Sequence, residues 1–270
     1  MKISRIKISE HYDLNTEAYF DIIQPTDMLD RGALRALPAL LICPGGAYGM
    51  LSKREGEPVA LEFLARGYVA VILNYSVVTN EGNNSYPKQL HELMAAFDYL
   101  SANCEEFGID PDRIFVMGFS AGGHLVCNLG VEYPDYLSRY NLKIKGICLA
   151  YPVISSDFGI SGNTYNNLLK DYEGEKKEHL LKSLSFTNSN LEKFPPTFIW
   201  TTNTDNVVSS LNSIVFVEML SRFNRTCEFH LFPIGPHGFS TASELINEPN
   251  PQLKHVSEWI DMCDKFFKSL

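Results

Sequence analysis

The sequence predicts an α/β fold in which a mostly parallel sheet is covered by helices on both faces. Short, continuous apolar runs, which are typical of strands buried on both faces, alternate along the chain with segments of helical periodicity. The 270 residues, 45% of them hydrophobic and 20% charged, provide enough apolar side chains for one large core. No internal repeat or low-complexity linker divides the chain, so we expect a single domain spanning residues 1–270.

Two segments of alternating hydrophobicity, residues 3–8 and 18–23, open the chain and predict an antiparallel pair of edge strands. The remaining strands are expected at residues 38–43, 68–73, 114–117, 146–150, 197–200 and 227–232. Helices are expected at residues 59–66, 86–104, after Ser120, and at 253–267. The helix at 86–104 has an apolar stripe formed by Leu90, Leu93, Met94, Phe97 and Leu100.

Residues 152–194 interrupt this alternation of strands and helices. The segment is polar, rich in Ser, Asn and Lys, and carries isolated aromatic side chains at Phe158, Tyr165 and Tyr172. Ligands of open α/β folds bind at the carboxyl ends of the strands, and an insertion between two strands can cover that edge. We therefore expect residues 152–194 to form a small cap, with a plain surface excursion as the alternative.

The sequence Gly-Phe-Ser-Ala-Gly at residues 118–122 lies where the strand at 114–117 passes into a helix. Gly-x-Ser-x-Gly in this context is a sharp turn that exposes a serine hydroxyl for attack on a carbonyl carbon. The serine backbone is strained there, and only residues without Cβ let strand and helix pack closely around it. The pattern by itself also fits a glycine-rich turn, or a helix that begins with Ser120 as its N-cap.

A serine hydroxyl needs a base within hydrogen-bond reach and a carboxylate that orients the base. In the fold that uses this turn, the acid and then the histidine follow the serine along the chain. Asp205 is the carboxylate of the loop after strand 197–200, and His237 lies in a Gly/Pro-flanked loop after strand 227–232. Each alone could be a turn or solvated residue, but their order and positions favour a catalytic triad. The other histidines lie in helices, a strand or the insertion: His91, His124, His179, His230 and His255.

Acyl transfer also needs backbone donors for the oxyanion of the tetrahedral intermediate. The N–H of Ala121, directly after the serine, is one such donor at the start of a helix. A second donor is expected in the loop Pro-Gly-Gly-Ala-Tyr-Gly at residues 44–49, directly after the strand at 38–43. A phosphate-binding loop is the rival interpretation, but the Gly-Lys-Ser/Thr ending of a P-loop is missing here.

Together these motifs resemble the α/β-hydrolase superfamily, and within it the esterase/lipase branch that includes acetylxylan-esterase-like enzymes. The resemblance spans residues 38–270 and implies the α/β-hydrolase fold. It implies a catalytic triad of Ser120, Asp205 and His237, and an oxyanion hole made by the amides of Gly46, Ala47 and Ala121. The sequence departs from many relatives at Pro44, where they have histidine, and at Ala47, where they have a third glycine.

Four aromatic residues in or near these motifs and the insertion are expected to contact the substrate: Tyr48, Tyr75, Phe119 and Phe158. No large apolar lid of the kind that lipases use at lipid surfaces is visible in residues 152–194. The modest, polar insertion and the family likeness therefore favour a small ester, such as an acetylated sugar, as substrate.

The composition limits the classes of partner and cofactor. A net charge of −9 argues against nucleic acid as the main partner, and no apolar run is long enough to insert into a membrane. The six cysteines lie mostly in apolar runs without metal-ligand spacing. The acyl-enzyme mechanism expected for a serine esterase implies neither a metal nor an organic cofactor. The cytoplasm is the simplest compartment for such cysteines. The composition does not determine the oligomeric state, and a homo-oligomer is compatible with it.

These observations predict a serine carboxylesterase that hydrolyses small, acetyl-type esters through an acyl-enzyme intermediate. A lipase or a peptidase of the same fold is the alternative enzyme class. A non-catalytic binding protein that retains a hydrolase fold is the alternative outside catalysis, because fold alone does not determine function. The three triad positions are all occupied, which disfavours that alternative.

Overall fold

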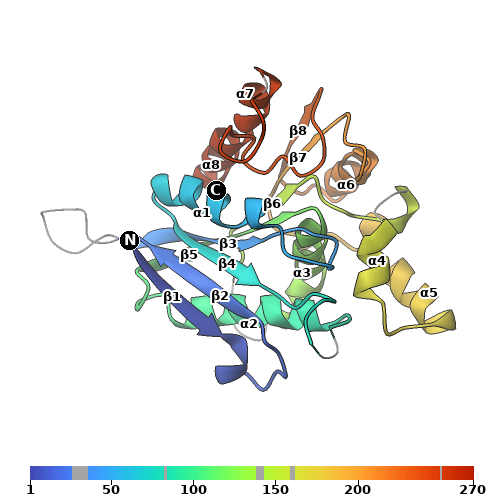
Figure 1. Cartoon of the computed structure of the whole chain (residues 1–270), viewed down its shortest axis with the longest axis horizontal. Coiled ribbons are helices and arrows are strands. Elements are labelled where there is room, and N and C mark those ends of the chain that lie inside the picture. The colour runs from blue at the N-terminus through green and yellow to red at the C-terminus, as the bar shows by residue number, and fades with distance from the viewer. Residues whose placement is uncertain (26–35, 82–83, 138–142, 159–161, 250) are drawn as a thin grey trace, which may run out of the picture.

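A mixed, mostly parallel sheet forms the centre of the computed structural model (Figure 1). The structure describes residues 1–25, 36–81, 84–137, 143–158, 162–249 and 251–270. Within these residues the sheet has eight strands in the order β1-β2-β4-β3-β5-β6-β7-β8. The strands are β1 (Lys2–Lys7), β2 (Tyr19–Gln24), β3 (Leu37–Cys43), β4 (Val69–Asn74), β5 (Ile109–Phe119), β6 (Gly146–Ala150), β7 (Thr197–Thr202) and β8 (Cys227–Phe232).

The strand directions confirm the predicted fold class. β1 and β2 pair antiparallel, with Ile3 opposite Ile23, and β2 also pairs antiparallel with β4. From β4 to β8 every neighbouring pair is parallel. The carboxyl ends of the parallel strands therefore meet at one edge of the sheet, where an open α/β fold binds its ligand.

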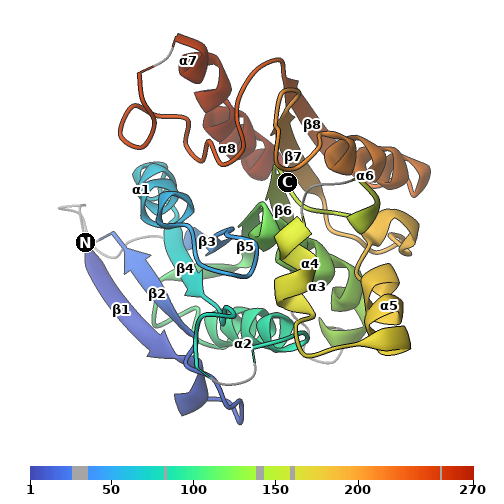
Figure 2. The same cartoon turned by 45° about the vertical axis from the view of Figure 1, so that its right-hand side comes forward.

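Helices cover both faces of the sheet, as Figures 1 and 2 show from two directions. One face packs against α1 and α8, and the opposite face packs against α2, α3 and α6. The helices are α1 (Glu57–Ala65), α2 (Lys88–Ala102), α3 (Ala121–Leu137), α4 (Gly162–Leu168), α5 (Gly174–Ser183), α6 (Leu211–Arg222), α7 (Pro251–Ser257) and α8 (Trp259–Ser269). Short 3₁₀ helices occur at η1 (Ile8–Glu10), η2 (Lys53–Glu55), η3 (Ser156–Phe158) and η4 (Phe186–Asn188).

Alternating side chains of the strands belong to two separate apolar clusters, one on each face of the sheet. In β3, Leu40 and Ile42 pack on the side of α1 and α8, whereas Leu41 packs on the side of α2 and α3. This alternation follows from the two-residue period of a strand, and it explains why the strand sequence is continuously apolar. The predicted apolar stripe of α2 is buried at all five of its positions.

Residues 152–194 contain α4 and α5, which lie beside α3 in both views (Figures 1 and 2). Tyr165 of α4 is buried, and its ring contacts the ring of His124 of α3 edge to face, with 5.3 Å between the centroids. The segment is therefore packed on the helix that follows Ser120. Phe158, one of its isolated aromatic residues, is half-buried in η3.

Two helical predictions need correction. The helix α6 is not among those expected from the sequence, because its central run Ile-Val-Phe-Val consists of β-branched and aromatic residues that lower helix propensity. The single helix expected at residues 253–267 is divided at Glu258 into α7 and α8. At the break, the Ser257 hydroxyl donates to the carbonyl oxygen of Lys254 and so competes with the helical backbone pattern.

We predict that Trp259→Ala destabilises the protein by about 3–5 kcal/mol, because the substitution leaves a large cavity in the core. The Trp259 ring is fully buried, stacks on Trp200 with 5.0 Å between centroids, and donates its Nε1–H to the Ser240 carbonyl. Urea unfolding measures the change. Leu245→Ala is the control, because Leu245 is 76% exposed and should change stability by no more than about 0.5 kcal/mol. Equal effects of the two substitutions would contradict the prediction.

Candidate active site

Ser120 occupies the turn between β5 and α3. Its φ of 52° lies in the left-handed region, which is uncommon for a residue with a side chain and concentrates at functional sites. The neighbouring glycines are required by close packing: a Cβ on Gly118 would lie 2.2 Å from the Gly122 carbonyl oxygen, and one on Gly122 would lie 2.1 Å from that of Cys43. The turn thus depends on the sequence pattern that predicts it.

The structure brings Ser120, His237 and Asp205 into one hydrogen-bonded line. His237 Nε2 lies 2.8 Å from the Ser120 hydroxyl oxygen, and His237 Nδ1 lies 2.7 Å from Asp205 Oδ2. The Asp205 carboxylate can only accept at Nδ1, so the neutral imidazole has its proton there and Nε2 accepts from the serine. This is the arrangement that nucleophilic catalysis by a serine requires.

Asp205 and His237 are each held by their own loop. The side chain of Asp205 is 1% exposed, and its Oδ1 accepts from the backbone N–H groups of Val207 and Val208, each at 2.9 Å. The side chain of His237 is 17% exposed, and its ring contacts Tyr151 at 5.0 Å between centroids. Asp205 is therefore oriented without solvent, whereas His237 keeps an exposed edge toward the cavity.

The loop after β3 has a backbone suited to an oxyanion hole. Gly46, Ala47 and Tyr48 have φ values of 124°, 53° and 55°, so three consecutive residues lie outside the usual backbone regions. The N–H groups of Gly46 and Ala47 have no hydrogen-bond acceptor among the residues that the structure describes. Ala121 is the first residue of α3, so its N–H has no partner in the helix. These three donors are available to a ligand.

Two side chains hold this loop in place. The N–H of Gly45 donates to Glu55 Oε2 at 2.8 Å, and the side-chain amide of Asn167 in α4 donates to the Ala47 carbonyl at 2.8 Å. Glu55 is buried, and its second oxygen accepts from the Tyr151 hydroxyl at 2.7 Å. The Tyr151 hydroxyl accepts in turn from the N–H of Ser240, three residues after His237. Glu55 therefore connects residues 44–49, here called the oxyanion loop, to the loop that holds His237 and Ser240.

His124 forms a second connection beneath the site. Its Nδ1 accepts from the Tyr48 hydroxyl at 2.9 Å, and its Nε2–H donates to the Leu184 carbonyl at 3.0 Å. The imidazole is fully buried, and this burial lowers its pKa from the ordinary 6.5 to about 4. A neutral His124 thus joins the oxyanion loop, α3 and the end of the segment that contains α5.

A cavity of about 630 Å³, here called the catalytic cavity, opens above Ser120 and His237. The oxyanion loop contributes Gly46 and Ala47, and α4 contributes Asn163 and Thr164 to its wall. The volume lies within the roughly 300–1,000 Å³ of ligand sites in proteins. Residues from both the sheet edge and the segment 152–194 therefore surround the space above the serine.

None of the four aromatic residues expected to contact the substrate lines the catalytic cavity. The Tyr48 and Tyr75 side chains are buried, and their hydroxyls are already bonded, to His124 and to the Pro44 carbonyl. Phe119 is fully buried against Trp259 and Tyr151. Phe158 in η3 also lies outside the wall of this cavity.

The residues that support the site were not predicted from the sequence. Glu55 lies in the highly polar run Lys-Arg-Glu-Gly-Glu, which looks solvent-exposed in the sequence. Asn167 lies in a polar insertion, and its contact with residue 47 spans 120 positions of the chain. The only signal for His124 was its position one helical turn after Ser120. Long-range contacts of this kind leave no local pattern.

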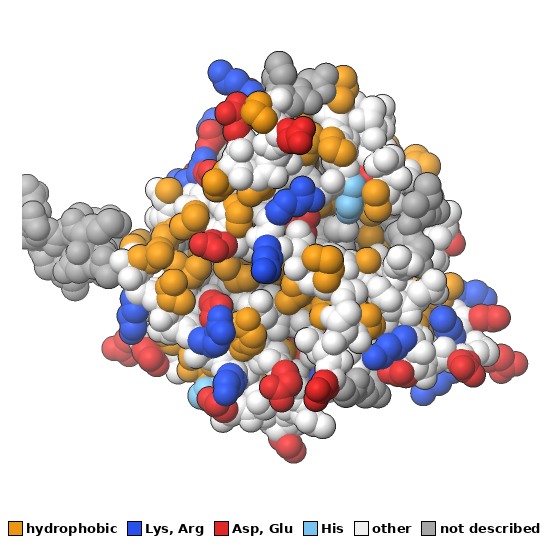
Figure 3. Space-filling model, in the orientation of Figure 1, with side chains coloured by type: hydrophobic (Ala, Val, Ile, Leu, Met, Phe, Trp, Pro, Cys, Tyr) orange, Lys and Arg blue, Asp and Glu red, His pale blue; other side chains and the backbone are white. Residues whose placement is uncertain are grey.

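The described residues contain no group of three or more His, Cys, Asp or Glu side chains arranged to hold a metal ion. None of the helices in this part of the chain is long and apolar enough to cross a membrane. Figure 3 shows acidic and basic side chains interspersed over one face of the molecule.

The model of the BD-FAE family matches residues 28–220, which is more than half of the chain. The chain belongs to the BD-FAE family. The chain is also similar to the acetylxylan esterase of Xylanibacter ruminicola, 29% identical over 204 residues, which are 74% of this chain and 41% of that protein. The endo-1,4-beta-xylanase B of Butyrivibrio fibrisolvens is 29% identical over 211 residues, which are 76% of this chain and 33% of that protein. The chain thus spans less than half the length of either relative.

Among solved structures, this BD-FAE member is similar to the acetyl ester-xyloside bifunctional hydrolase of Caldicellulosiruptor lactoaceticus. The TM-score is 0.81 at 30% sequence identity, and the match covers 98% of this chain and 96% of that chain. A match along nearly the whole of both chains agrees with the eight-stranded sheet described above. The esterase-like α/β-hydrolase fold expected from the sequence is confirmed.

We predict that His124 reduces the stability of the protein as the pH falls from about 6.5 to 4. In this range the unfolded state binds a proton at His124 and the folded state does not, so stability decreases by about 3 kcal/mol. Urea unfolding at pH 7, 5.5 and 4.5 measures this dependence. His124→Gln should lower the stability at pH 7 but should lack this component of the pH dependence. Parallel pH profiles for the two proteins would show that His124 does not contribute.

Proposed function

We propose that the protein is a serine carboxylesterase that hydrolyses acetyl-type esters of small alcohols and sugars. The hydrogen-bonded line of Ser120, His237 and Asp205 at the floor of the catalytic cavity carries the proposal. A nucleophile, a base and an orienting acid occur together, next to three unpaired backbone donors. A binding protein would have no need of this combination.

In the acylation step, the Ser120 oxygen attacks the ester carbonyl carbon while His237 Nε2 accepts the hydroxyl proton. The carbonyl oxygen becomes an oxyanion, which accepts hydrogen bonds from the N–H groups of Gly46, Ala47 and Ala121. Asp205 stabilises the imidazolium that forms, while remaining ionised itself. When the tetrahedral intermediate collapses, the C–O bond to the alcohol breaks and His237 returns the proton to the departing alkoxide.

In the deacylation step, water takes the place of the alcohol. His237 Nε2 accepts a proton from this water, the resulting hydroxide attacks the acyl carbon, and the same three amides stabilise the second oxyanion. The bond between the acyl carbon and the Ser120 oxygen then breaks, and His237 protonates the serine. The products are acetate and the free enzyme, so that no metal or organic cofactor enters the cycle.

The proposed substrate class is supported by the relatives and by the wall of the cavity. An acetylxylan esterase and an acetyl ester-xyloside hydrolase are among the similar proteins. Asn163, Thr164 and Ser52 provide polar groups to the catalytic cavity, whereas Met50 and Leu51 provide an apolar side. This mixture suits a short acyl group attached to a hydroxyl-rich alcohol. Residues 152–194, which contribute Asn163 and Thr164, would then act as the cap.

A cytoplasmic location is part of the proposal. All six cysteines belong to the described residues and have free thiols, and burial raises the pKa of Cys43 and Cys127 above the ordinary value. Free, unreactive thiols suit a reducing compartment.

We predict that Ser120→Ala lowers kcat/KM for p-nitrophenyl acetate by at least about 10⁴-fold, because the nucleophile is removed. The wild-type protein should also react with a fluorophosphonate probe, and the variant should not. Ser183→Ala, at an exposed position of α5, is the control and should keep both properties. A folded wild-type protein that shows neither labelling nor ester hydrolysis would refute the enzymatic function.

We predict that Glu55→Gln lowers kcat by about 10- to 100-fold with little change in KM, since small displacements of catalytic groups have effects of this size. Glutamate accepts from both Gly45 and Tyr151, whereas glutamine offers one acceptor oxygen and an NH₂ group that cannot accept. Steady-state kinetics of the folded variant provide the measurement. Glu57→Gln, at an exposed position two residues further on, is the control and should leave kcat unchanged. Equal kinetics for the two variants would exclude a positioning role of Glu55.

A further inference from the structure

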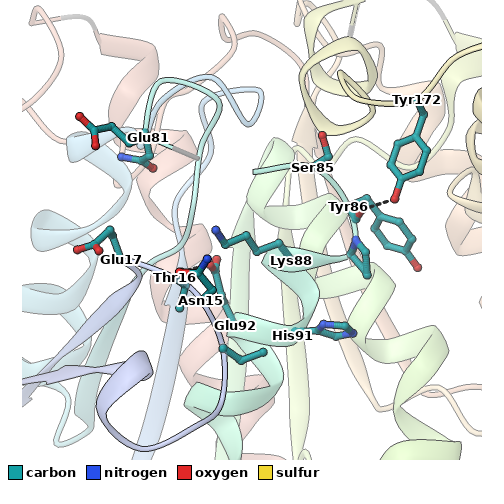
Figure 4. A pocket seen from close by; sticks show the side chains of 13 residues that line it. Asn15, Thr16, Glu17, Glu81, Ser85, Tyr86, Lys88, His91, Glu92 and Tyr172 are labelled. Carbon is teal, nitrogen blue, oxygen red and sulfur yellow. Dashed lines mark hydrogen bonds between the residues drawn. The ribbon is translucent and has the colours of Figure 1, made fainter. Parts of the chain in front are cut away.

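We propose that the protein binds a neutral oligosaccharide chain along a groove that leads from Ser120 to a second cavity, here called the distal cavity. The proposal rests on the proposed function, because the acyl group that Ser120 attacks would be a substituent of the bound chain. Its new content is a binding site remote from the triad. The distal cavity has a volume of about 910 Å³ and is formed around the start of α2 (Figure 4).

The two cavities are connected by a third. The catalytic cavity shares Met50 and Leu51 with a smaller cavity of about 280 Å³. This smaller cavity shares Glu17 and Asn80 with the distal cavity. Since each neighbouring pair has common wall residues, the three cavities adjoin one another along the surface. An extended ligand can therefore lie in all of them at once, whereas a small acetyl ester needs only the first.

Size supports a ligand of several units. The distal cavity is larger than the catalytic cavity and lies at the upper end of the roughly 300–1,000 Å³ that small-molecule sites occupy. No step of ester hydrolysis uses this space. A chain of sugar units would occupy the space without requiring a second chemical step.

The wall of the distal cavity offers hydrogen-bonding groups that the protein itself does not use. Among the described residues, no hydrogen bond or ion pair engages the side chains of Asn15, Glu17, Glu81 and His91. Figure 4 shows the Glu17 and Glu81 carboxylates at the left of the cavity and the His91 ring at its lower right. Amides, carboxylates and imidazole together provide both donors and acceptors, which is what the hydroxyl groups of a sugar require.

Two tyrosine rings complete the wall. Tyr86 and Tyr172 lie side by side on the side away from Glu17, and the Tyr172 hydroxyl donates to the Tyr86 carbonyl at 2.7 Å (Figure 4). An aromatic ring presents an apolar face with a polar edge. A pyranose ring has the same character, with C–H groups on its faces and hydroxyls around its edge. Tyr172 follows α4, so the segment 152–194 contributes to both ends of the groove.

The charge of the wall selects a neutral chain. Two exposed carboxylates, Glu17 and Glu81, and the buried Glu92 line the distal cavity together with Lys88, and the Lys176 ammonium lies over the Tyr172 ring at 4.9 Å. The Lys88 ammonium donates to the side chain of Asn84, and Glu92 at the floor accepts from the N–H and hydroxyl of Ser76. The excess of negative charge would repel an oligosaccharide that carries uronic acids. An uncharged chain of hydroxyl-rich sugars is not repelled by these carboxylates.

The binding experiment uses the full chain with Ser120→Ala, so that its result does not depend on catalysis. Xylose, xylotriose and xylohexaose are titrated calorimetrically, with an oligogalacturonate of equal length as the charged comparison. We expect affinity to increase from xylose to xylohexaose and to be weaker for the oligogalacturonate. Glu81→Ala and His91→Ala should each weaken xylohexaose binding about fivefold, as the loss of about one hydrogen bond does. The matched controls Glu175→Ala and His179→Ala, at exposed positions of α5, should have no effect.

The kinetic experiment separates this proposal from the proposed function. Glu81→Ala and His91→Ala should raise KM for an acetylated xylohexaose about fivefold and leave the hydrolysis of p-nitrophenyl acetate unchanged. Equal affinity for xylose and xylohexaose, tighter binding of the oligogalacturonate, or unchanged affinity in both variants would overturn the proposal. If the wild-type protein does not hydrolyse p-nitrophenyl acetate, the esterase function is refuted. The titrations would still test binding along the groove.

Discussion

The close contact between the start of α3 and the end of β3 is the constraint on which the site depends. β3 and β5 are parallel neighbours with Cys43 opposite Gly118, so both strands end at the same level of the sheet. The chain after β5 must then turn sharply, and α3 begins against the carbonyl of Cys43 with no room for a Cβ at Gly122. This packing brings the backbone donors that follow β3 next to the Ser120 hydroxyl. The arrangement of Ser120 and the backbone donors thus results from the strand register and from the absence of a Cβ at Gly118 and Gly122.

Buried polar groups keep these loops in their strained conformations. Positive φ values at Ala47, Tyr48 and Ser120 each cost free energy, of the order of 1–3 kcal/mol, and persist only where surrounding contacts demand them. Glu55 and Asn167 bind the oxyanion loop through its backbone, and His124 binds it through the Tyr48 hydroxyl. None of these side chains needs to touch a substrate. They hold the backbone donors in place, which is the condition that the proposed electrostatic stabilisation of an oxyanion requires.

The sequence was sufficient for the parts of the molecule that are encoded locally. Strand runs, the glycines around Ser120, and the order of Asp205 and His237 along the chain are local patterns or follow from fold topology. The partners of a buried polar group are not local, so the supporting roles of Glu55 and His124 were invisible. The same reason applies to Tyr48 and Tyr75, because the sequence does not show that their hydroxyls bond to the distant His124 and Pro44. At α6, local preference opposed the tertiary structure and misled the prediction.

The hydrogen bond from Asn167 to Ala47 and that from His124 to Leu184 join residues 152–194 to the part of the site that would stabilise the oxyanion. The segment that shapes the cavity is therefore not an independent module. Exchange of this segment between related proteins would alter substrate range only if both contacts were retained. Evolution of new specificity in this chain is consequently easier by substitution at wall positions such as Asn163 and Thr164 than by replacement of the whole segment.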